Sequence, residues 1–310
     1  MQSEGSSHKE EKEEYNDLFV SQAQETTTTT AGTVVSLWRY PVKSMLGEEL
    51  NSSYITERGL LGDRAYALID QETGKVASAK NPRKWGKLFD FRAAFIEDPS
   101  PPQEVDKNIL PPVRITFPDG THILSSNQDN IDHTLSSVLG REVRLMRATD
   151  LEKPSYEEYW PDIEGLAQRE KVTDEAMPSK TFFDIAVIHI LTTSTIDRLR
   201  ELYPEGRFEV RRFRPNIVVE SASSSPGEKK KDFIENLWVG KKLKIGEDII
   251  LRVIGPCTRC VMITLPQADL PKDLGILRTV AQYNRVTAGV YATVHEGGGT
   301  IRQGVQIRLE

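Results

Sequence analysis

Short runs of β-branched and aromatic residues, bounded by glycine, proline and polar turns, recur along most of the chain. Residues 33–40 form one such run, which Pro41 ends because proline has no N–H to donate to a strand ladder. Turns at residues 71–74 and 118–120 each separate two runs and indicate β-hairpins. Further strands are expected at residues 49–56, 142–147, 217–220, 242–245, 248–255, 260–265, 289–294 and 305–309. The pattern predicts a mostly β fold with a few helices (α+β), built from β-barrels or sandwiches.

Helical spacing is confined to a few short segments. Ile131, Leu135 and Leu139 recur on one helix face, and Gly140 is placed to end that helix. Two further helices are expected, one capped by residues 192–194 and one at residues 275–282. A largely apolar run at residues 182–191 instead predicts a strand buried on both faces.

Composition divides the chain into parts. The charged and threonine-rich residues 1–31 are poor in core-forming side chains and predict a disordered tail. Residues 32–149 are expected to form a first, mostly β domain and residues 150–310 a second, with the polar segment 150–178 at their boundary. Within the second domain, the Ser/Pro/Lys-rich residues 221–231 predict a mobile insertion.

Charge and cysteine content exclude several classes of protein. The 310 residues carry a net charge of −6, which gives no electrostatic reason to expect a nucleic-acid partner. No apolar run is long enough for a membrane span or a signal peptide, and two cysteines cannot form a disulfide framework. We therefore expect a cytoplasmic protein with no integral membrane segment. Organelle association stays open, as does a short docking turn at residues 15–20 of the tail.

Both cysteines lie three positions apart within residues 255–267, and four interpretations are open. A structural zinc site needs four ligands, and no histidine is near in sequence. A redox dithiol would begin a helix, whereas residues 260–265 predict a strand. The pair could also be two small buried residues. Finally, one thiolate could be a soft metal ligand, with Arg259 beside it favouring the ionised form.

Three other segments place polar side chains at strand ends or turns, namely Lys43 with Ser44, Arg64, and Arg214 with Asn216. Lysine, serine and arginine in such places bind phosphate through charge-assisted hydrogen bonds, and asparagine recognises the edge of a polar heterocycle. Each segment alone also has a plain structural explanation. Arg64 could simply pair with Asp63, and Lys43 could simply be solvated.

In combination, the segments resemble the molybdenum cofactor sulfurase C-terminal (MOSC) family. The motifs occur in the family's order and are Val42-Lys43-Ser44, Gly62-Asp63-Arg64-Ala65-Tyr66, Phe213-Arg214-Pro215-Asn216 and Arg259-Cys260-Val261-Met262-Ile263-Thr264. The chain is similar, over residues 33–309, to MOSC proteins of the amidoxime-reducing component type. This resemblance implies a MOSC N-terminal β-barrel-like domain followed by a MOSC β-barrel domain.

The resemblance further implies a molybdenum cofactor (molybdopterin) bound between the two domains. Its metal would be held by Cys260, whereas Cys257 matches a position that need not be cysteine in the family. Asp184 matches an aspartate beside the metal in the amidoxime-reducing members, and a plain role in pairing with arginine or capping a turn is kept open. The remaining cofactor-binding residues are expected to be Lys43, Ser44, Arg64, Arg214, Asn216 and Arg259.

The implied activity is reduction of a small N-hydroxylated compound, in which two electrons and two protons convert N–OH to N–H, with Cys260 and Asp184 as catalytic residues. Electrons would come from an external donor, of the cytochrome b5/reductase or ferredoxin type, because the chain has no iron–sulfur cysteine set and no dinucleotide fingerprint. Two alternatives are a non-enzymatic carrier that holds sulfur or cofactor on Cys260, and a structural protein with inert cysteines. Binding of pyridoxal phosphate is also kept open.

Overall fold

The computed structural model describes residues 29–101, 110–222 and 231–310. Most of the expected tail, and most of the expected insertion at 221–231, lie outside these residues. The last three residues of the expected tail, 29–31, are part of the first strand, β1 (Thr29–Arg39).

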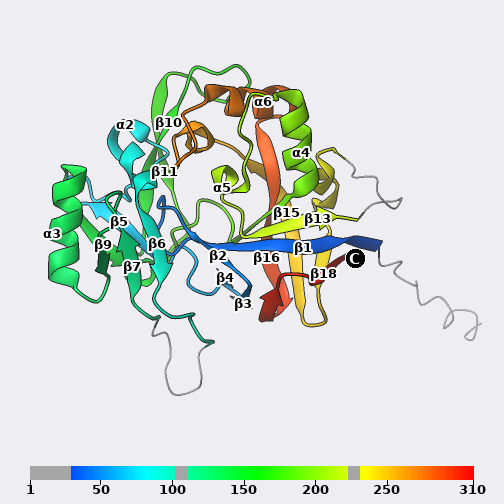
Figure 1. The fold of residues 1–310 in the computed structure, drawn as a ribbon, viewed down its shortest axis with the longest axis horizontal. Helices are drawn as coiled ribbons and strands as arrows, with labels where there is room; N and C mark the ends of the chain where they lie inside the picture. Colours follow the sequence, from blue (N-terminus) through cyan, green and yellow to red (C-terminus); the bar gives the residue numbers. More distant parts are fainter. Residues whose placement is uncertain (1–28, 102–109, 223–230) are drawn as a thin grey trace, which may run out of the picture.

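Seven strands close into a β-barrel on one side of the molecule (Figure 1). In barrel order after β1 they are β13 (Ile217–Ser221), β12 (Ile188–Thr192), β16 (Thr287–Gly297), β15 (Ile249–Thr258), β14 (Lys242–Ile245) and β18 (Gln306–Leu309), which pairs back to β1. Closure pairs each of these seven strands on both sides, and alternate residues such as Leu37, Ile190 and Leu251 fill the interior. The prediction of a mostly β fold with a barrel is confirmed.

The barrel joins the two ends of the chain. Strand β1 pairs with β13 and β18, and the short β2 (Glu48–Leu50) pairs with β1. In a smaller sheet, β17 (Gly299–Arg302) pairs with β3 (Ser52–Thr56), which also pairs with β4 (Gly59–Leu60). The expected division of the chain between residues 149 and 150 stays a prediction. Strands β1 and β3, which precede that point in the sequence, pair with strands that follow it.

A second, β-rich part of the molecule lies beside the barrel (Figure 1). Its elements are β5 (Tyr66–Asp70), α2 (Pro82–Trp85), η1 (Gly86–Asp90), β6 (Arg92–Phe95), β7 (Val113–Thr116), β8 (His122–Leu124), α3 (Gln128–Leu139), β9 (Val143–Arg147) and η2 (Ala148–Asp150). They enclose an apolar cluster that includes Leu68, Phe91, Ile115 and Leu135. Gly140 ends α3 at φ +69°, and β7 pairs with β8, so both predictions are confirmed.

Three expectations about secondary structure are wrong. The polar segment 150–178, where no strand was expected, contains a hairpin, β10 (Ser155–Trp160) with β11 (Lys171–Ala176), in which Glu158 pairs with Lys80 and Glu157 with Lys84. Only the end of the apolar run 182–191 is a strand, β12. Residues 260–265 form a 3₁₀ turn, η4 (Val261–Thr264), because a short buried apolar run does not by itself distinguish a turn from a strand.

A fourth expectation holds in part. The runs flanking residues 71–74 were expected to pair with each other, but β5 pairs mainly with β9. Its contact with the second run is a single bridge between Ile69 and Val76, with a few flanking hydrogen bonds.

The remaining helices pack on the barrel around an apolar cluster that includes Leu199, Phe208 and Ile276. They are α4 (Thr193–Leu202), α5 (Val210–Phe213), η3 (Ile234–Trp238) and α6 (Leu274–Asn284). The expected cap is confirmed, since the Thr192 hydroxyl accepts a hydrogen bond from the backbone N–H of Thr195 at 3.1 Å. Among the described residues, no helix has both the length and the apolarity required to cross a membrane.

Candidate functional site

A cleft with about 730 Å³ of empty space, part of it open to solvent, lies where loops of the second part meet strands β12, β15 and β16 of the barrel. All eight residues predicted from the sequence line it, namely Lys43, Ser44, Arg64, Asp184, Arg214, Asn216, Arg259 and Cys260. These residues come from five segments that are far apart in the chain. The structure therefore brings the predicted residues together, while the role of each stays a prediction.

Three of these residues adopt a backbone conformation that is costly for any side chain. Ser44, Arg64 and Arg214 have φ values of +64°, +48° and +55°. Non-glycine residues in this region require support from their surroundings, and they cluster at functional sites. The Ser44 hydroxyl accepts a hydrogen bond from the N–H of Ala79 at 3.0 Å, and Arg214 Nη1 donates to the carbonyl of Met45 at 2.6 Å. These contacts hold the loop of Ser44 and Met45 against the segment of Ala79 on one side and the loop of Arg214 on the other.

Asn216 links the barrel to the loop that carries Arg64. Its Nδ2 donates to Asp63 Oδ2 at 2.9 Å, and its Oδ1 accepts from the N–H of His189 at 3.1 Å. Asp63 in turn accepts from the N–H of Tyr40 at 2.8 Å and from the Arg64 guanidinium. Because its amide group is engaged in these bonds, Asn216 fixes the relative position of the cleft walls.

Asp184 lies between two lysines at the centre of the cleft. Lys43 Nζ donates to Asp184 Oδ1 at 2.6 Å and to the carbonyl of Phe182 at 2.9 Å. On the other side, Lys80 Nζ lies 3.2 Å from Asp184 Oδ2 and 3.1 Å from Glu158 Oε2. The expectation that Asp184 begins the buried strand is wrong, since it precedes β12 in a loop.

This arrangement sets the charges of the three groups. Burial would raise the pKa of Asp184, but Lys43 and Lys80 outweigh it and hold that pKa well below its usual range. Burial lowers the pKa of Lys43, against the opposing effect of Asp184. Burial would also lower the pKa of Lys80, but Asp184 and other neighbours raise it well above its usual value. Asp184 is thus an ionised clamp, and Lys43 is the lysine that gives up a proton more readily.

The first cysteine, Cys257, is buried in the barrel wall of the cleft. Its sulfur accepts a hydrogen bond from Arg259 Nη1 at 2.7 Å. Burial would raise the pKa of the Cys257 thiol, but Arg259, His189 and Tyr291 outweigh it and lower that pKa to about 6. The expectation that Arg259 favours ionisation mainly of Cys260 is therefore wrong, because the guanidinium bonds to the other sulfur.

The second cysteine, Cys260, is half-buried at the start of η4 rather than at the head of a strand. Burial raises the pKa of its thiol to about 11, with Lys80 opposing and Glu158 assisting. Arg212, which is fully buried, donates from Nη1 to the carbonyls of Ile263 and Leu265 at 3.2 and 3.1 Å and so fixes the turn that follows Cys260.

The side chains that line the cleft suit an anionic group with a soft metal. Five cationic residues and one carboxylate face it, the cations being Lys43, Arg64, Lys80, Arg214 and Arg259. The Nε of Arg259 is buried without a hydrogen-bond partner among the described residues, which leaves a donor available. A thiol such as Cys260 is a ligand that soft metals select. The donor set therefore fits the molybdenum cofactor that the sequence motifs imply.

Other metal chemistry has less support. In the part of the chain that the structure describes, no group of three His, Cys, Asp or Glu side chains is arranged to hold a metal ion. Cys257 and Cys260 are both free thiols.

Sequence reasoning missed several residues in and beside the cleft. Lys80 lines the cleft, and Tyr156 and Glu158 contact Lys80 from behind it. Tyr156 and Glu158 were not considered because their segment was taken as a polar boundary. His189 and Asp184 are the two titratable residues within the apolar run 182–191, and the presence of a histidine there was a usable signal. Tyr291 carries no such signal, since alternating residues in a β-strand are often aromatic.

Two protein-family models match parts of the chain. Residues 31–93 match the family model described as "MOSC N-terminal beta barrel domain", and residues 179–308 match the one described as "MOSC domain".

The individual proteins to which the chain is similar share 23–26% of its residues over the matched regions. The chain is 25% identical over 266 residues to the molybdenum cofactor sulfurase of Oryza sativa subsp. japonica, covering 79% of this chain and 30% of that protein. It is 26% identical over 252 residues to the mitochondrial amidoxime reducing component 2 of Bos taurus (76% and 66%). It is 23% identical over 270 residues to the mitochondrial amidoxime-reducing component 1 of Homo sapiens (82% and 72%). The chain spans about a third of the length of the sulfurases that it matches.

Proposed function

The chain is a MOSC-domain protein with a MOSC N-terminal beta barrel domain, and from this premise we propose that it binds a molybdenum cofactor and reduces N-hydroxylated compounds. One observation carries the proposal. Seven residues predicted from four separate motifs, together with Asp184, line one cationic cleft that contains a half-buried cysteine. Such a cleft would neutralise the phosphate of the cofactor and offer a thiol to its metal.

The residues would divide the work of holding the cofactor. Lys43, Arg64, Arg214 and Arg259 supply positive charge and N–H donors for the phosphate and pterin. Cys260 is the metal ligand in this proposal. Its raised pKa is no obstacle, because a coordinated metal ion removes the proton of a thiol outright.

When bound, the cofactor supplies two-electron redox chemistry at molybdenum. The chain itself would orient the substrate and manage protons. Asp184 remains ionised between its two lysines, so it is poorly suited to donate a proton at neutral pH. The Nζ of Lys43, whose pKa is lowered by burial, is the better proton donor, with Asp184 holding it in place. Electrons would come from an external partner of the cytochrome b5/reductase or ferredoxin type.

The second candidate is a carrier that holds sulfur or cofactor on Cys260 without catalysing reduction. It is supported by the similarity to molybdenum cofactor sulfurases, which are among the relatives of this chain. The same cleft serves both functions, so only turnover distinguishes them.

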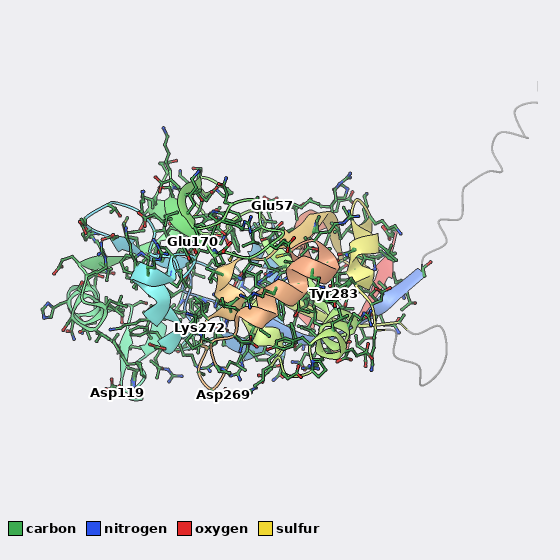
Figure 2. All side chains as sticks on the ribbon, turned by 90° about the horizontal axis from the view of Figure 1, so that it is seen from above. Glu57, Asp119, Glu170, Asp269, Lys272 and Tyr283 are labelled. Carbon is green, nitrogen blue, oxygen red and sulfur yellow. The ribbon has the colours of Figure 1, made fainter. Side chains whose placement is uncertain are left out.

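Turnover of benzamidoxime, with chemically reduced methyl viologen as electron donor, tests the proposal on protein from a host that makes the cofactor. The cofactor-loaded chain should form benzamidine, and Asp184→Asn should lower kcat by about 100-fold, because it releases the proposed proton donor Lys43 and positioned proton transfer contributes about that factor. Asp119→Asn is the matched control, since Asp119 lies exposed on the β7–β8 turn (Figure 2) and its loss should leave kcat unchanged. Loaded protein that shows no turnover but releases sulfur with cyanide would support the carrier instead.

A further inference from the structure

Cys257 is a buried nucleophile that the proposed reaction does not use. Only 1% of its surface is exposed, yet it forms part of the wall of the cleft. Its sulfur accepts a hydrogen bond from Arg259 Nη1 at 2.7 Å, and His189 and Tyr291 are close enough to help lower its pKa. Three polar side chains thus converge on one sulfur atom, which is more support than a merely packed cysteine requires.

The strand ladders of the barrel account for this convergence. His189 on β12 lies opposite Tyr291 on β16, and Tyr291 lies opposite Gly255 on β15, two residues before Cys257. Gly289 makes room for the histidine, because a Cβ at this position would lie 2.2 Å from His189 Nε2. His189 and Tyr291 are therefore fixed by backbone pairing in the closed barrel, and Arg259 directly follows β15.

The surroundings favour negative charge on this sulfur. The guanidinium of Arg259 is buried and directly bonded to it. Cations outnumber carboxylates among the residues that line the cleft, five to one. The lowered pKa of Cys257, about 6, agrees with this geometry. A thiolate so placed is nucleophilic, and the cations around it attract anionic reagents.

We propose that Cys257, rather than Cys260, is the nucleophilic thiolate of the cofactor-free cleft and a modification site for small anionic electrophiles. Iodoacetate serves as the probe. The sulfur supplies an electron pair to form the S–C bond, the C–I bond breaks, and iodide leaves, so no further oxidant or base is required. This inference does not depend on the proposed reductase activity.

The test treats the cofactor-free full-length chain with limiting iodoacetate at pH 7 and maps the label by peptide mass analysis. Cys257 should be carboxymethylated about tenfold faster than Cys260, since the thiolate is the reactive form. Cys260→Ser should keep the label and Cys257→Ser should lose it. The ratio of iodoacetate to iodoacetamide rates at Cys257 should exceed the ratio in urea-unfolded chain.

A milder pair of variants addresses the donors without deleting the thiol. Tyr291→Phe removes a hydroxyl that helps lower the pKa of Cys257, so labelling of Cys257 at pH 7 should slow severalfold and its pH inflection should rise. Tyr283→Phe should change neither, because Tyr283 lies exposed on α6 (Figure 2). Preferential labelling of Cys260, or labelling of Cys257 no faster than in unfolded chain, would overturn the proposal. If the ratio of iodoacetate to iodoacetamide rates at Cys257 is the same in folded and unfolded chain, the proposed preference for anionic reagents is overturned.

Discussion

The two walls of the cleft treat two cysteines three residues apart in opposite ways. In the barrel wall, Arg259 and its neighbours outweigh burial and lower the pKa of Cys257 to about 6. Cys260 instead lies under the influence of Lys80 and Glu158, on the side of the β10–β11 hairpin, and burial raises its pKa to about 11. The comparison shows that local sequence does not decide which sulfur is charged. The elements packed against each sulfur decide it.

The difference suits a site with a single metal ligand. In the cofactor-free protein, a neutral Cys260 thiol places no unpaired charge in its half-buried position. It becomes a thiolate when a metal replaces its proton. A charged Cys257, in contrast, neutralises the buried Arg259 above about pH 6 without any metal. Two adjacent thiolates would repel each other, so this division keeps the cofactor-free protein stable.

The hairpin wall is the side of the cleft next to the β10–β11 hairpin. Substitution of Lys80 should have the largest effect on stability of the variants considered. Lys80 pairs with Glu158 and Asp184, so Lys80→Met leaves both carboxylates with less compensation. Removing one partner of a buried ion pair costs about 3 kcal/mol of unfolding free energy. Urea unfolding at pH 7 measures this loss.

Lys87→Met is the control for that substitution, since Lys87 is exposed in η1 and should change the unfolding free energy by less than about 0.5 kcal/mol. Equal effects of the two substitutions would show that the Lys80 cluster does not support the hairpin wall.

The barrel wall can be tested through pH. The folded-state pKa of Cys257 is lowered, so its contribution to stability is complete above the unfolded pKa, near 8.5, and is lost as pH falls through about 6. As pH rises between these two values, the unfolding free energy of the cofactor-free protein should increase, relative to that of Cys257→Ser, by at most about 1.4 kcal/mol per pH unit. Unfolding free energies measured in urea at several pH values give the slope.

Cys260→Ser sharpens the contrast. The raised pKa of Cys260 keeps its thiol protonated in this range, so its contribution changes only above the unfolded pKa and is lost toward pH 11. The slope from pH 6 to 8 should therefore survive Cys260→Ser. Loss of the slope in this variant, or its retention in Cys257→Ser, would contradict the difference between the walls.

Local signals predicted much of the fold. The helix stop at Gly140, the cap at Thr192 and the β7–β8 hairpin each depend on neighbours in sequence, and each was found. The pairing of β1 with β13 and β18 could not be derived, because closure of a barrel depends on contacts between distant residues. The hairpin in residues 155–176 was missed because its buried charges resemble a solvated linker.

The site was predicted better than its chemistry. Family motifs supplied Lys43, Arg64 and Cys260, which line one cleft as expected. Adjacency in sequence suggested that Arg259 acts on Cys260, whereas the guanidinium bonds to Cys257. The path of the chain after β15 determines where that side chain points, and no local pattern encodes it. Partners supplied by other elements, such as Lys80, are invisible for the same reason.

The most direct test of the account is the molybdenum and pterin content of the chain purified from a cofactor-producing host. Wild-type protein should contain both, and Cys260→Ala should lose molybdenum by about tenfold or more, because it removes the proposed metal ligand. Cys257→Ala should retain most of it, since this sulfur is hydrogen-bonded to Arg259 and is not the proposed metal ligand. Absence of molybdenum and pterin from the wild-type chain, or undiminished molybdenum in Cys260→Ala, would contradict the account.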